Sequence, residues 1–251
     1  MLTYEVLSKP GGRDVNEDAV GVRLADRGGL FVLADGLGSY GYGDVAASYT
    51  VRHLLQAYRP QSPSSAQRFL IDSIQEIQAG LHCLQQETMR YRSIRTTLAA
   101  AHLQDGQLTL AHAGDSRIYL FGKHRAIWRT TDHSVPQMLA LSGQIRESQI
   151  AHHPDRSRLL NALGGDTENL KIDLTIQMAD SWQAMLLCSD GFWEYVPQGQ
   201  MQRTLRYSHS CGEWLAQMEK SALKNGRRSV MDNYSAIAVW FRTDEPKISS
   251  L

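Results

Sequence analysis

Short acidic segments recur along this chain, and the setting of their aspartates indicates a shared site. Asp35 and Asp190 each follow an apolar run typical of a buried strand, and each precedes a glycine. A carboxylate at the end of a buried strand is costly to desolvate unless a positive charge lies beside it. Several converging carboxylates would also raise one another's pKa unless cations neutralised them. We therefore predict a site for hard divalent metal ions at strand ends. The acidic segments are 13–18, 34–36, 189–191 and 231–233, with a fifth at 114–117.

Six segments, taken in order, resemble the PP2C-type, metal-dependent serine/threonine protein phosphatases. They are Arg-x-x-Asn-Glu-Asp at 13–18, Ala-Asp-Gly-x-Gly at 34–38, Thr-Thr-Leu-Ala at 96–99, Gly-Asp-Ser-Arg at 114–117, Ser-Asp-Gly-Phe-Trp-Glu at 189–194 and Asp-Asn-Tyr-Ser at 232–235. Any one segment is weak evidence, because Asp-Gly alone is a common turn pair. The resemblance is specific because all six occur in order, over nearly the whole chain.

The resemblance implies a site that holds two metal ions. Asp35 would bridge both ions, and the carbonyl group of Gly36 would ligate one of them. Asp190 and Asp232 would complete the shell of the first ion. Mn²⁺ and Mg²⁺ suit such a site, because both take oxygen ligands and keep several waters.

The same resemblance assigns further acidic residues to the site. Glu17 and Asp18 would serve the second ion, largely through bound waters. Asp115 matches the aspartate that binds a third, weaker ion in bacterial members of the family. Asp115 also opens a turn between two predicted strands, which is a sufficient structural reason for an aspartate there.

The chemistry implied for this site is the hydrolysis of a phosphate monoester. Two divalent ions about 3.5–4 Å apart can share a water, lower its pKa and clamp the transferring oxygens. Arg13 lies where the family places its phosphate-binding arginine, and its planar guanidinium group offers a bidentate fork. The alternative is that Arg13 is an ordinary surface arginine, exposed to solvent, without a role in binding phosphate. No serine, cysteine or aspartate nucleophile is needed.

The chain departs from the family pattern next to the predicted metal site. Many members have a histidine, a proposed general acid, where this chain has Leu37, and a glycine where it has Ser39. Three histidines are candidates for protonating the leaving group on chemical grounds only: His133, His152 and His153. A lone histidine is more often a structural hydrogen-bonding group.

Other segments are expected to support the site. Thr96 and Thr97 are predicted strand residues near the cleft, and Arg117 is expected to pair with a nearby carboxylate. Residues 144–163 correspond to the mobile flap of the family, and their basic character would suit an acidic phosphopeptide; an ordinary solvated loop is the alternative. The basic residues of this flap are Arg146, Arg156 and Arg158.

Composition limits the class of protein. The 251 residues are enough for one large domain, with 26 basic and 26 acidic residues. Balanced charge argues against nucleic acid as a partner, because that affinity depends on many Lys and Arg contacts. Three cysteines without paired spacing indicate reduced thiols, with Cys188 in the core. We expect no signal peptide, because residues 1–5 lack a basic and apolar stretch, and no membrane span, because no apolar segment reaches bilayer length. We expect a cytoplasmic, monomeric protein.

The order of predicted elements indicates an α+β fold. Strands are predicted at 19–24, 30–34, 97–103, 108–113, 118–121, 170–178, 184–188 and 235–241, and helices at 44–57, 65–87, 135–142 and 212–224. Strands occur in groups with helices between them, unlike a parallel βαβ sheet. The resemblance implies a four-layer α-β-β-α sandwich of two antiparallel sheets flanked by helices, formed by residues 1–243, with a polar tail at 244–251.

The leading hypothesis is a stand-alone bacterial protein phosphatase that acts on phosphoserine and phosphothreonine and opposes a Ser/Thr kinase. The segment 188–196 is similar to phosphatases associated with type VI secretion systems. One alternative is a catalytically silent relative that acts as a binding or regulatory module. Another is a metal-dependent hydrolase of other phosphoesters, although the neutral charge weighs against nucleic acid as its substrate.

Overall fold

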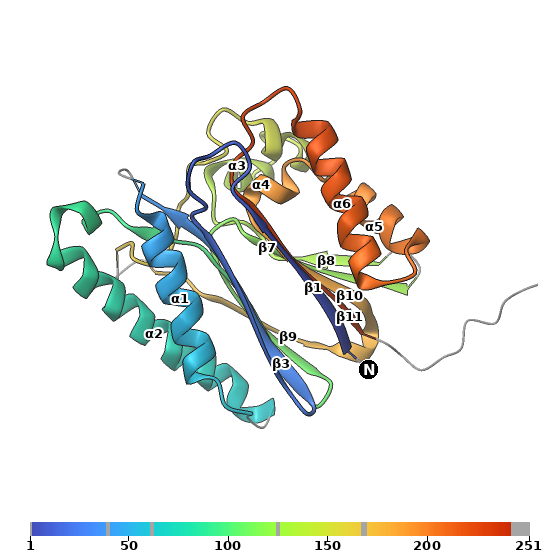
Figure 1. Cartoon of the computed structure of the whole chain (residues 1–251), viewed down its shortest axis with the longest axis horizontal. Helices are drawn as coiled ribbons and strands as arrows, with labels where there is room; N and C mark the ends of the chain where they lie inside the picture. The colour runs from blue at the N-terminus through green and yellow to red at the C-terminus, as the bar shows by residue number, and fades with distance from the viewer. Residues whose placement is uncertain (1, 39–40, 61–62, 124–125, 167–169, 242–251) are drawn as a thin grey trace, which may run out of the picture.

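Two antiparallel sheets lie face to face in the computed structural model, and helices cover the outer face of each sheet (Figure 1). The structure describes residues 2–38, 41–60, 63–123, 126–166 and 170–241. One sheet has the strand order β1-β11-β10-β7-β8, and the other has the order β2-β3-β5-β6-β9 with β4 paired to β3. The predicted α+β class and the four-layer α-β-β-α sandwich are therefore confirmed.

The elements have the following bounds. The first sheet consists of β1 (Leu2–Lys9), β11 (Tyr234–Phe241), β10 (Trp182–Cys188), β7 (Arg117–Gly122) and β8 (Ile127–Arg129). The second consists of β2 (Asp18–Ala25), β3 (Gly28–Leu37), β4 (Arg95–Thr96), β5 (Leu98–Gln104), β6 (Gln107–Ala113) and β9 (Asp173–Met178). The helices are α1 (Gly43–Ala57), α2 (Pro63–Glu87), α3 (Val135–Leu141), α4 (Asp190–Trp193), α5 (Gln198–Tyr207) and α6 (Cys211–Gly226), with short 3₁₀ turns η1 (Met89–Tyr91), η3 (Glu147–His152) and η5 (Ala179–Ser181).

The central strands are apolar on both faces because each face is covered. In β3, Phe31 and Leu33 point into the core between the two sheets, whereas Leu30 and Val32 point into the core beneath α1 and α2. Side chains alternate between the faces of a strand, so a strand with two covered faces becomes a continuous apolar run. The same alternation occurs in β10, between the inter-sheet core and the core beneath α6.

The helices bury one face each against the sheets. On α2, the predicted apolar face is buried at Leu70, Ile74, Ile77 and Leu81, against the sheet that carries β3. On α6, Trp214 is fully buried within the core of the other sheet. The sandwich therefore has three apolar layers, one between the sheets and one beneath the helices on each side.

The sequence prediction missed several elements, namely β1, β4, β8, α4 and α5, and it misplaced the start of one strand. β1 is an edge strand with exposed side chains at residues 4–6, so it has no apolar run that would predict a strand. α5 is polar over most of its length and buries only Met201 and Thr204. The predicted strand 170–178 begins only at Asp173.

Other predictions concern thiols and membranes. All three cysteines are free, with Cys188 buried as predicted, Cys211 also buried and Cys83 exposed. None of the helices in the described part of the chain combines the length and the apolar character needed to cross a bilayer. Ser39 and the predicted tail 244–251 lie outside the described residues.

Candidate metal centre

The ends of strands from both sheets bring the predicted aspartates together. Asp35 lies near the end of β3, and its cross-strand partner at the start of β2 is Asp18. Asp190 follows β10 in the other sheet and is the first residue of α4. The Asp190 carboxyl group is within hydrogen-bonding reach of Asp35. Three carboxyl groups from distant parts of the chain therefore share one site.

These carboxyl groups are poorly solvated and repel one another. Burial raises the pKa of Asp35 well above its ordinary value, and the neighbouring Asp18 and Asp190 raise it further. Burial likewise raises the pKa of Asp18 to about 7. Burial and nearby carboxylates disfavour the ionised form, whereas a cation between the groups would restore it. The electrostatics of the site therefore favour a bound cation.

One carboxylate oxygen of Asp18 accepts a hydrogen bond, and the other has no partner among the described residues. Its Oδ2 accepts a hydrogen bond of 2.8 Å from the Ser189 hydroxyl group. Its Oδ1 is buried and has no hydrogen-bond partner among the described residues. Because a buried, unpartnered carboxylate oxygen is costly, this atom fits a cation that would complete its interactions.

Asp115 joins the same cluster from the turn between β6 and β7. It is buried, and burial raises its pKa above the ordinary value, with Asp190 as the next cause. Gly114, directly before it, has φ +103°, and an added Cβ there would crowd the Thr97 side chain. Glycine adopts this backbone conformation without strain, so the Gly-Asp pair sets the direction in which Asp115 leaves the strand.

Glu17 and Gly36 pack tightly against the start of α1. One carboxylate oxygen of Glu17 accepts a hydrogen bond of 3.0 Å from the backbone N–H of Gly43, the first residue of α1. The Glu17 carbonyl oxygen accepts another, of 3.1 Å, from the Gly36 N–H. An added Cβ on Gly36 would clash with the Gly43 carbonyl group. Glu17 therefore also satisfies a helix N-terminus, a structural task that the motif did not reveal.

Asp232 and Arg13 form a bidentate ion pair at the exposed side of the cluster. The Arg13 Nε–H and Nη2–H groups donate to the two carboxylate oxygens of Asp232, at 3.0 and 2.9 Å. This pairing raises the pKa of the Arg13 guanidinium group. The structure therefore places Arg13 beside the acidic cluster, on the residue predicted to be a metal ligand.

The backbone of Asp35 is held by two threonines. Its N–H donates to the Thr97 Oγ1, and its carbonyl oxygen accepts from the Thr97 N–H, both at 2.9 Å. The Thr96 hydroxyl group donates to the same carbonyl oxygen at 2.9 Å. These contacts fix Asp35 in the site and give Thr96 and Thr97 the supporting position predicted for them.

The arrangement matches a family of known proteins. The family model described as protein phosphatase 2C matches residues 11–231. The chain belongs to the protein phosphatase 2C family.

Several relatives and solved structures are similar to this PP2C-family chain. The serine/threonine phosphatase stp of Listeria monocytogenes is 31% identical over 206 residues, which cover 80% of this chain and 81% of that protein. The crystal structure of Stp1 from Staphylococcus aureus is 29% identical, with a TM-score of 0.89, over 97% of this chain and 96% of that one. The catalytic domain of PstP in complex with two manganese ions is 25% identical, with a TM-score of 0.80, over 95% of this chain and 97% of that one.

Asn233 is a site residue whose role the sequence analysis did not assign. Its side-chain Oδ1 accepts a hydrogen bond of 2.8 Å from the Glu17 N–H, and its Nδ2–H donates to the carbonyl groups of Pro10 and Val15, each at 2.9 Å. The amide therefore ties the loop that carries Arg13 and Glu17 to the start of β11, the last strand. Its place beside Asp232 in the PP2C motif was the only available signal.

The contacts of His133 indicate a structural role for this residue in the PP2C-family chain. His133 Nδ1 accepts hydrogen bonds from the Gly114 N–H and from the Asn161 amide, whose orientation is itself fixed by two backbone bonds. Its Nε2 therefore carries the proton and donates to Asp173 at 3.0 Å. Potential ligand atoms of His112, His133 and Asp173 lie within 4.8 Å of one another, but a protonated Nε2 has no lone pair for a metal ion.

The contacts of the other two candidate histidines, His152 and His153, do not support a role as proton donor to the leaving group. His152 is exposed at the end of η3, and the His153 Nδ1 accepts a hydrogen bond from the Asp155 N–H. Their predicted role as general acids stays a prediction.

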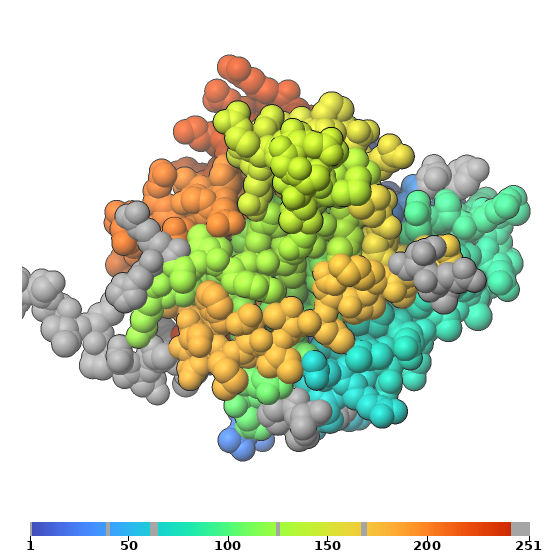
Figure 2. All heavy atoms as spheres, turned by 180° about the vertical axis from the view of Figure 1, so that it is seen from behind, coloured from blue at the N-terminus to red at the C-terminus, as the bar shows by residue number. Residues whose placement is uncertain are grey.

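The segment predicted to be the flap lies at one end of the molecule. Residues 144–163, coloured yellow-green to yellow, lie near the top of the face seen in Figure 2. Arg156 of this segment pairs with Glu194, the residue after α4, at 3.2 Å. Burial and the nearby Asp190 raise the pKa of Glu194 to about 7. The flap is therefore tied to the element that carries Asp190.

Proposed function

We propose that this protein hydrolyses phosphoserine and phosphothreonine in protein substrates, using a site for two divalent metal ions. The observation that carries this proposal is the convergence of Asp18, Asp35, Asp115 and Asp190 on one partly buried site, where burial raises the pKa of each carboxyl group. Among phosphatase sites, such a cluster without a covalent nucleophile suits metal-assisted hydrolysis. Membership of the PP2C family supports the same reaction class.

The residues present fit divalent cations with a preference for oxygen ligands. Asp35, Asp190 and Asp232 offer carboxylates, and Gly36 offers a backbone carbonyl group. Asp18 adds the unpartnered oxygen described above. Mn²⁺ and Mg²⁺ match this donor set. We propose two such ions, with a third at Asp115.

Each protein group has a definable task in the proposed reaction. When bound, the divalent ions would supply the Lewis-acid activation of the attacking water and neutralise charge on the phosphate. Glu17 holds its loop against α1 through the Gly43 N–H, so that its carboxylate stays at the site. Arg13 is half-exposed beside the carboxylates and pairs with Asp232; with the ions bound at Asp232, its guanidinium fork would be free to receive the phosphate dianion. Asp35 keeps its position through Thr97.

Two substitutions test the metal chemistry directly. Asp35→Ala and Asp190→Asn should each abolish turnover of p-nitrophenyl phosphate, because each removes a charged ligand. EDTA should inactivate the wild type, and Mn²⁺ or Mg²⁺ should restore it. Asp72→Asn, on the exposed side of α2, serves as the control and should keep full activity. Full activity after exhaustive chelation would refute the metal mechanism.

A substrate panel separates the alternatives. Hydrolysis of phosphoserine and phosphothreonine peptides in preference to phosphotyrosine peptides and nucleotides would support a protein phosphatase. Preferential hydrolysis of nucleotides would instead support a hydrolase of other phosphoesters. No turnover of any substrate at saturating Mn²⁺ would leave a regulatory module that binds without catalysis.

The cellular setting is also part of the proposal. We propose that residues 1–243 act as one catalytic domain, as a cytoplasmic monomer that opposes a Ser/Thr kinase, with no nucleic acid or membrane partner. The resemblance of residues 188–196 supports a connection with a type VI secretion system. A phosphoproteome comparison between cells with the wild type and cells with Asp190→Asn would identify the substrates.

A further inference from the structure

The turn that carries Asp115 is held by contacts on both sides. On one side, its neighbour Gly114 donates its N–H to His133 Nδ1 at 3.3 Å and accepts the His133 N–H at its carbonyl oxygen at 2.7 Å. On the other, the Ser116 hydroxyl group shares a hydrogen bond of 2.7 Å with the Thr97 hydroxyl group. Because Thr97 also binds the Asp35 backbone, the turn has a fixed relation to that aspartate.

A single indole ring ties the same turn to the element that carries Asp190. The Nε1–H of Trp193 donates to the carbonyl oxygen of Asp115 at 2.9 Å. Trp193 is the last residue of α4, and Asp190 is the first residue of this one-turn helix. Trp193 is only 5% exposed, so water offers little competition for this hydrogen bond. The ring therefore sets the distance between two carboxylate-bearing segments that come from different parts of the chain.

Arg117 fixes the plane of the Trp193 ring. The guanidinium carbon of Arg117 lies 3.4 Å from the ring centroid, a stacking geometry in which the cation faces the electron-rich surface. Arg117 is in turn held by Asp132 through two hydrogen bonds of 2.8 and 2.6 Å, and by the Tyr119 hydroxyl group at 2.9 Å. Its predicted pairing with a nearby carboxylate is thus confirmed, and all of these side chains are buried.

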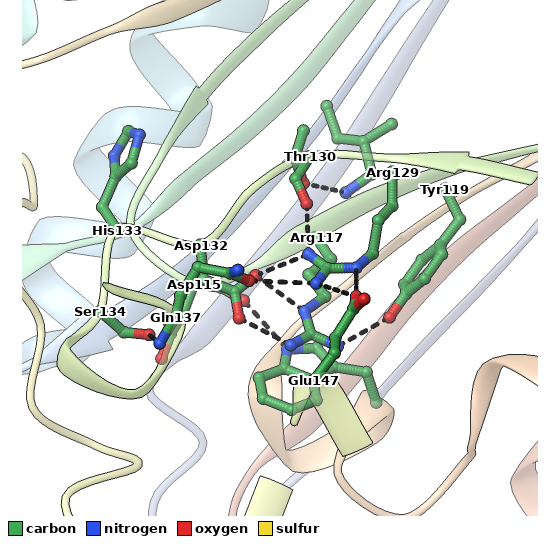
Figure 3. Close-up of polar contacts among 12 residues, drawn as sticks. Asp115, Arg117, Tyr119, Arg129, Thr130, Asp132, His133, Ser134, Gln137 and Glu147 are labelled. Atoms are coloured by element: carbon green, nitrogen blue, oxygen red, sulfur yellow. Dashed lines mark hydrogen bonds and ion pairs between the residues drawn. The ribbon is translucent and has the colours of Figure 1, made fainter. Parts of the chain in front are cut away.

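The support extends beyond this pair. Figure 3 shows the Asp132 carboxylate group in contact with the guanidinium groups of both Arg117 and Arg129, and Arg129 also binds Glu147 of η3. Arg129 donates as well to Gln137 of α3 at 3.0 Å. A buried ion pair with several additional hydrogen bonds is a rigid anchor, because breaking one partner leaves an uncompensated charge. The plane of the indole ring is therefore determined by the core rather than by the site.

We propose that Trp193, with Arg117 stacked on it, is a positioning residue that sets Asp115 relative to Asp190 for a metal ion held at Asp115. This inference rests on the proposed function, because it assumes the third ion. Trp193 does not ligate the ion or touch the substrate. It acts by holding the Asp115 backbone, and the position of that backbone sets the position of the Asp115 carboxylate group. Loss of partners that orient metal ligands typically lowers metal affinity about 10- to 100-fold.

The test compares two buried tryptophans that make the same hydrogen bond. Trp193→Phe removes the N–H donor and keeps an aromatic ring beneath Arg117. Trp214→Phe is the matched control, because the Trp214 Nε1–H donates to the Met201 carbonyl oxygen at 3.0 Å in the core beneath α6. Asp115→Ala, alone and combined with Trp193→Phe, defines the effect of losing the proposed ligand itself.

Two measurements would be made on each variant. The Mn²⁺ dependence of p-nitrophenyl phosphate hydrolysis gives an activation midpoint, and isothermal titration with Mn²⁺ counts ions and their affinities without turnover. Trp193→Phe should raise the midpoint about 10-fold and weaken the weakest ion in the titration by a similar factor. Trp214→Phe should leave both unchanged, although its Tm falls. The double variant should behave like Asp115→Ala alone.

The outcomes distinguish this inference from the proposed function. A midpoint that shifts in Asp115→Ala but not in Trp193→Phe would overturn the inference and leave the third ion in place. An equal shift in Trp214→Phe would show a general effect of lost stability and would also overturn it. An unshifted midpoint in Asp115→Ala would remove the third ion, and the inference with it. The two-ion chemistry would then still be judged by Asp35→Ala and Asp190→Asn.

A second variant covers the case in which Trp193→Phe does not fold, as judged by circular dichroism. Arg117→Lys keeps a positive charge beside Asp132 but loses the planar group that stacks on the indole ring. It should raise the Mn²⁺ midpoint in the same direction. A folded Arg117→Lys protein with the wild-type midpoint and the wild-type number of bound ions would refute the role of the stacked pair.

Discussion

Replacing Asp18 with asparagine should stabilise the metal-free protein at alkaline pH, even though it removes a proposed metal ligand. The reason is that Asp18 is buried with one unpartnered oxygen beside other carboxylates, which raises its pKa to about 7. An unfolded chain has no such environment, and its aspartates titrate near pH 4. The folded state therefore binds the proton more tightly than the unfolded state does.

The sign and the size of the effect follow from this difference in pKa. A group whose pKa is raised by folding favours the folded state at low pH, and its contribution is lost as the pH rises from about 4 through about 7. A rise of that size corresponds to about 4 kcal/mol of destabilisation once Asp18 is ionised. Asparagine cannot ionise, but its amide group would leave an unpartnered donor, which costs about 1–3 kcal/mol. The net gain at pH 8 should be about 1–3 kcal/mol, and it should vanish or reverse at pH 5.

Thermal unfolding in EDTA measures this prediction. For a chain of this length, the expected gain corresponds to a Tm about 2–10 °C higher than that of the wild type at pH 8. Asp72→Asn is the control, because Asp72 is an exposed carboxylate on α2, paired with Arg68, and its replacement should leave Tm nearly unchanged at both pH values. Added Mn²⁺ should raise the Tm of the wild type more than that of Asp18→Asn.

One result would refute the reasoning. If the difference in Tm between Asp18→Asn and the wild type in EDTA is the same at pH 5 and at pH 8, then folding does not raise the pKa of Asp18. The convergent carboxylates would then be adequately solvated without a cation, and their burial would no longer support a metal site.

Three further substitutions test the site and its supports. In steady-state kinetics, Arg13→Ala should lower kcat/KM by a factor corresponding to about 1.5–3 kcal/mol, and KM should rise more than kcat falls. An unchanged kcat/KM would show that Arg13 is a solvated surface residue without a role in binding phosphate. Gly191→Ala should lower the free energy of unfolding by about 1–3 kcal/mol, measured in urea, because the added Cβ would overlap the Asn233 carbonyl group. Gly199→Ala is the control and should not lower it, because the space around Gly199 is open. Asp132→Ala should cost about 3–5 kcal/mol in the same assay, because it leaves the buried guanidinium group of Arg117 without its carboxylate partner. A loss below about 1 kcal/mol would mean that this group is solvated.

The fold was predictable where burial produces a pattern. Central strands such as β3 and β10 are apolar on both faces, so their positions are visible in the sequence, and the amphipathic face of α2 is equally clear. The edge strand β1 and the polar helix α5 were missed because they bury few side chains. Their pairing and packing depend on neighbours that a local pattern does not contain.

The position of the functional residues was predictable, but their present partners were not. The motif placed Arg13 and Asp232 in one site, whereas only the structure shows that they bind each other. The motif likewise suggested Glu17 as a ligand, and the structure adds its contact with the N-terminus of α1. Trp193 gave no chemical signal in the sequence, since its contacts with Asp115 and Arg117 span 78 and 76 positions of the chain.

The sequence by itself indicated the family, the reaction class and a set of acidic residues that the structure brings together, because these depend on residue types that occur in a fixed order. The tertiary structure alone decided how the groups meet. Only the packing of two sheets brings Asp35 to Asp190 and partly shields both from water, and desolvation and mutual repulsion then raise their pKa values. Those energies depend on distances through space, which the order of residues along the chain does not contain.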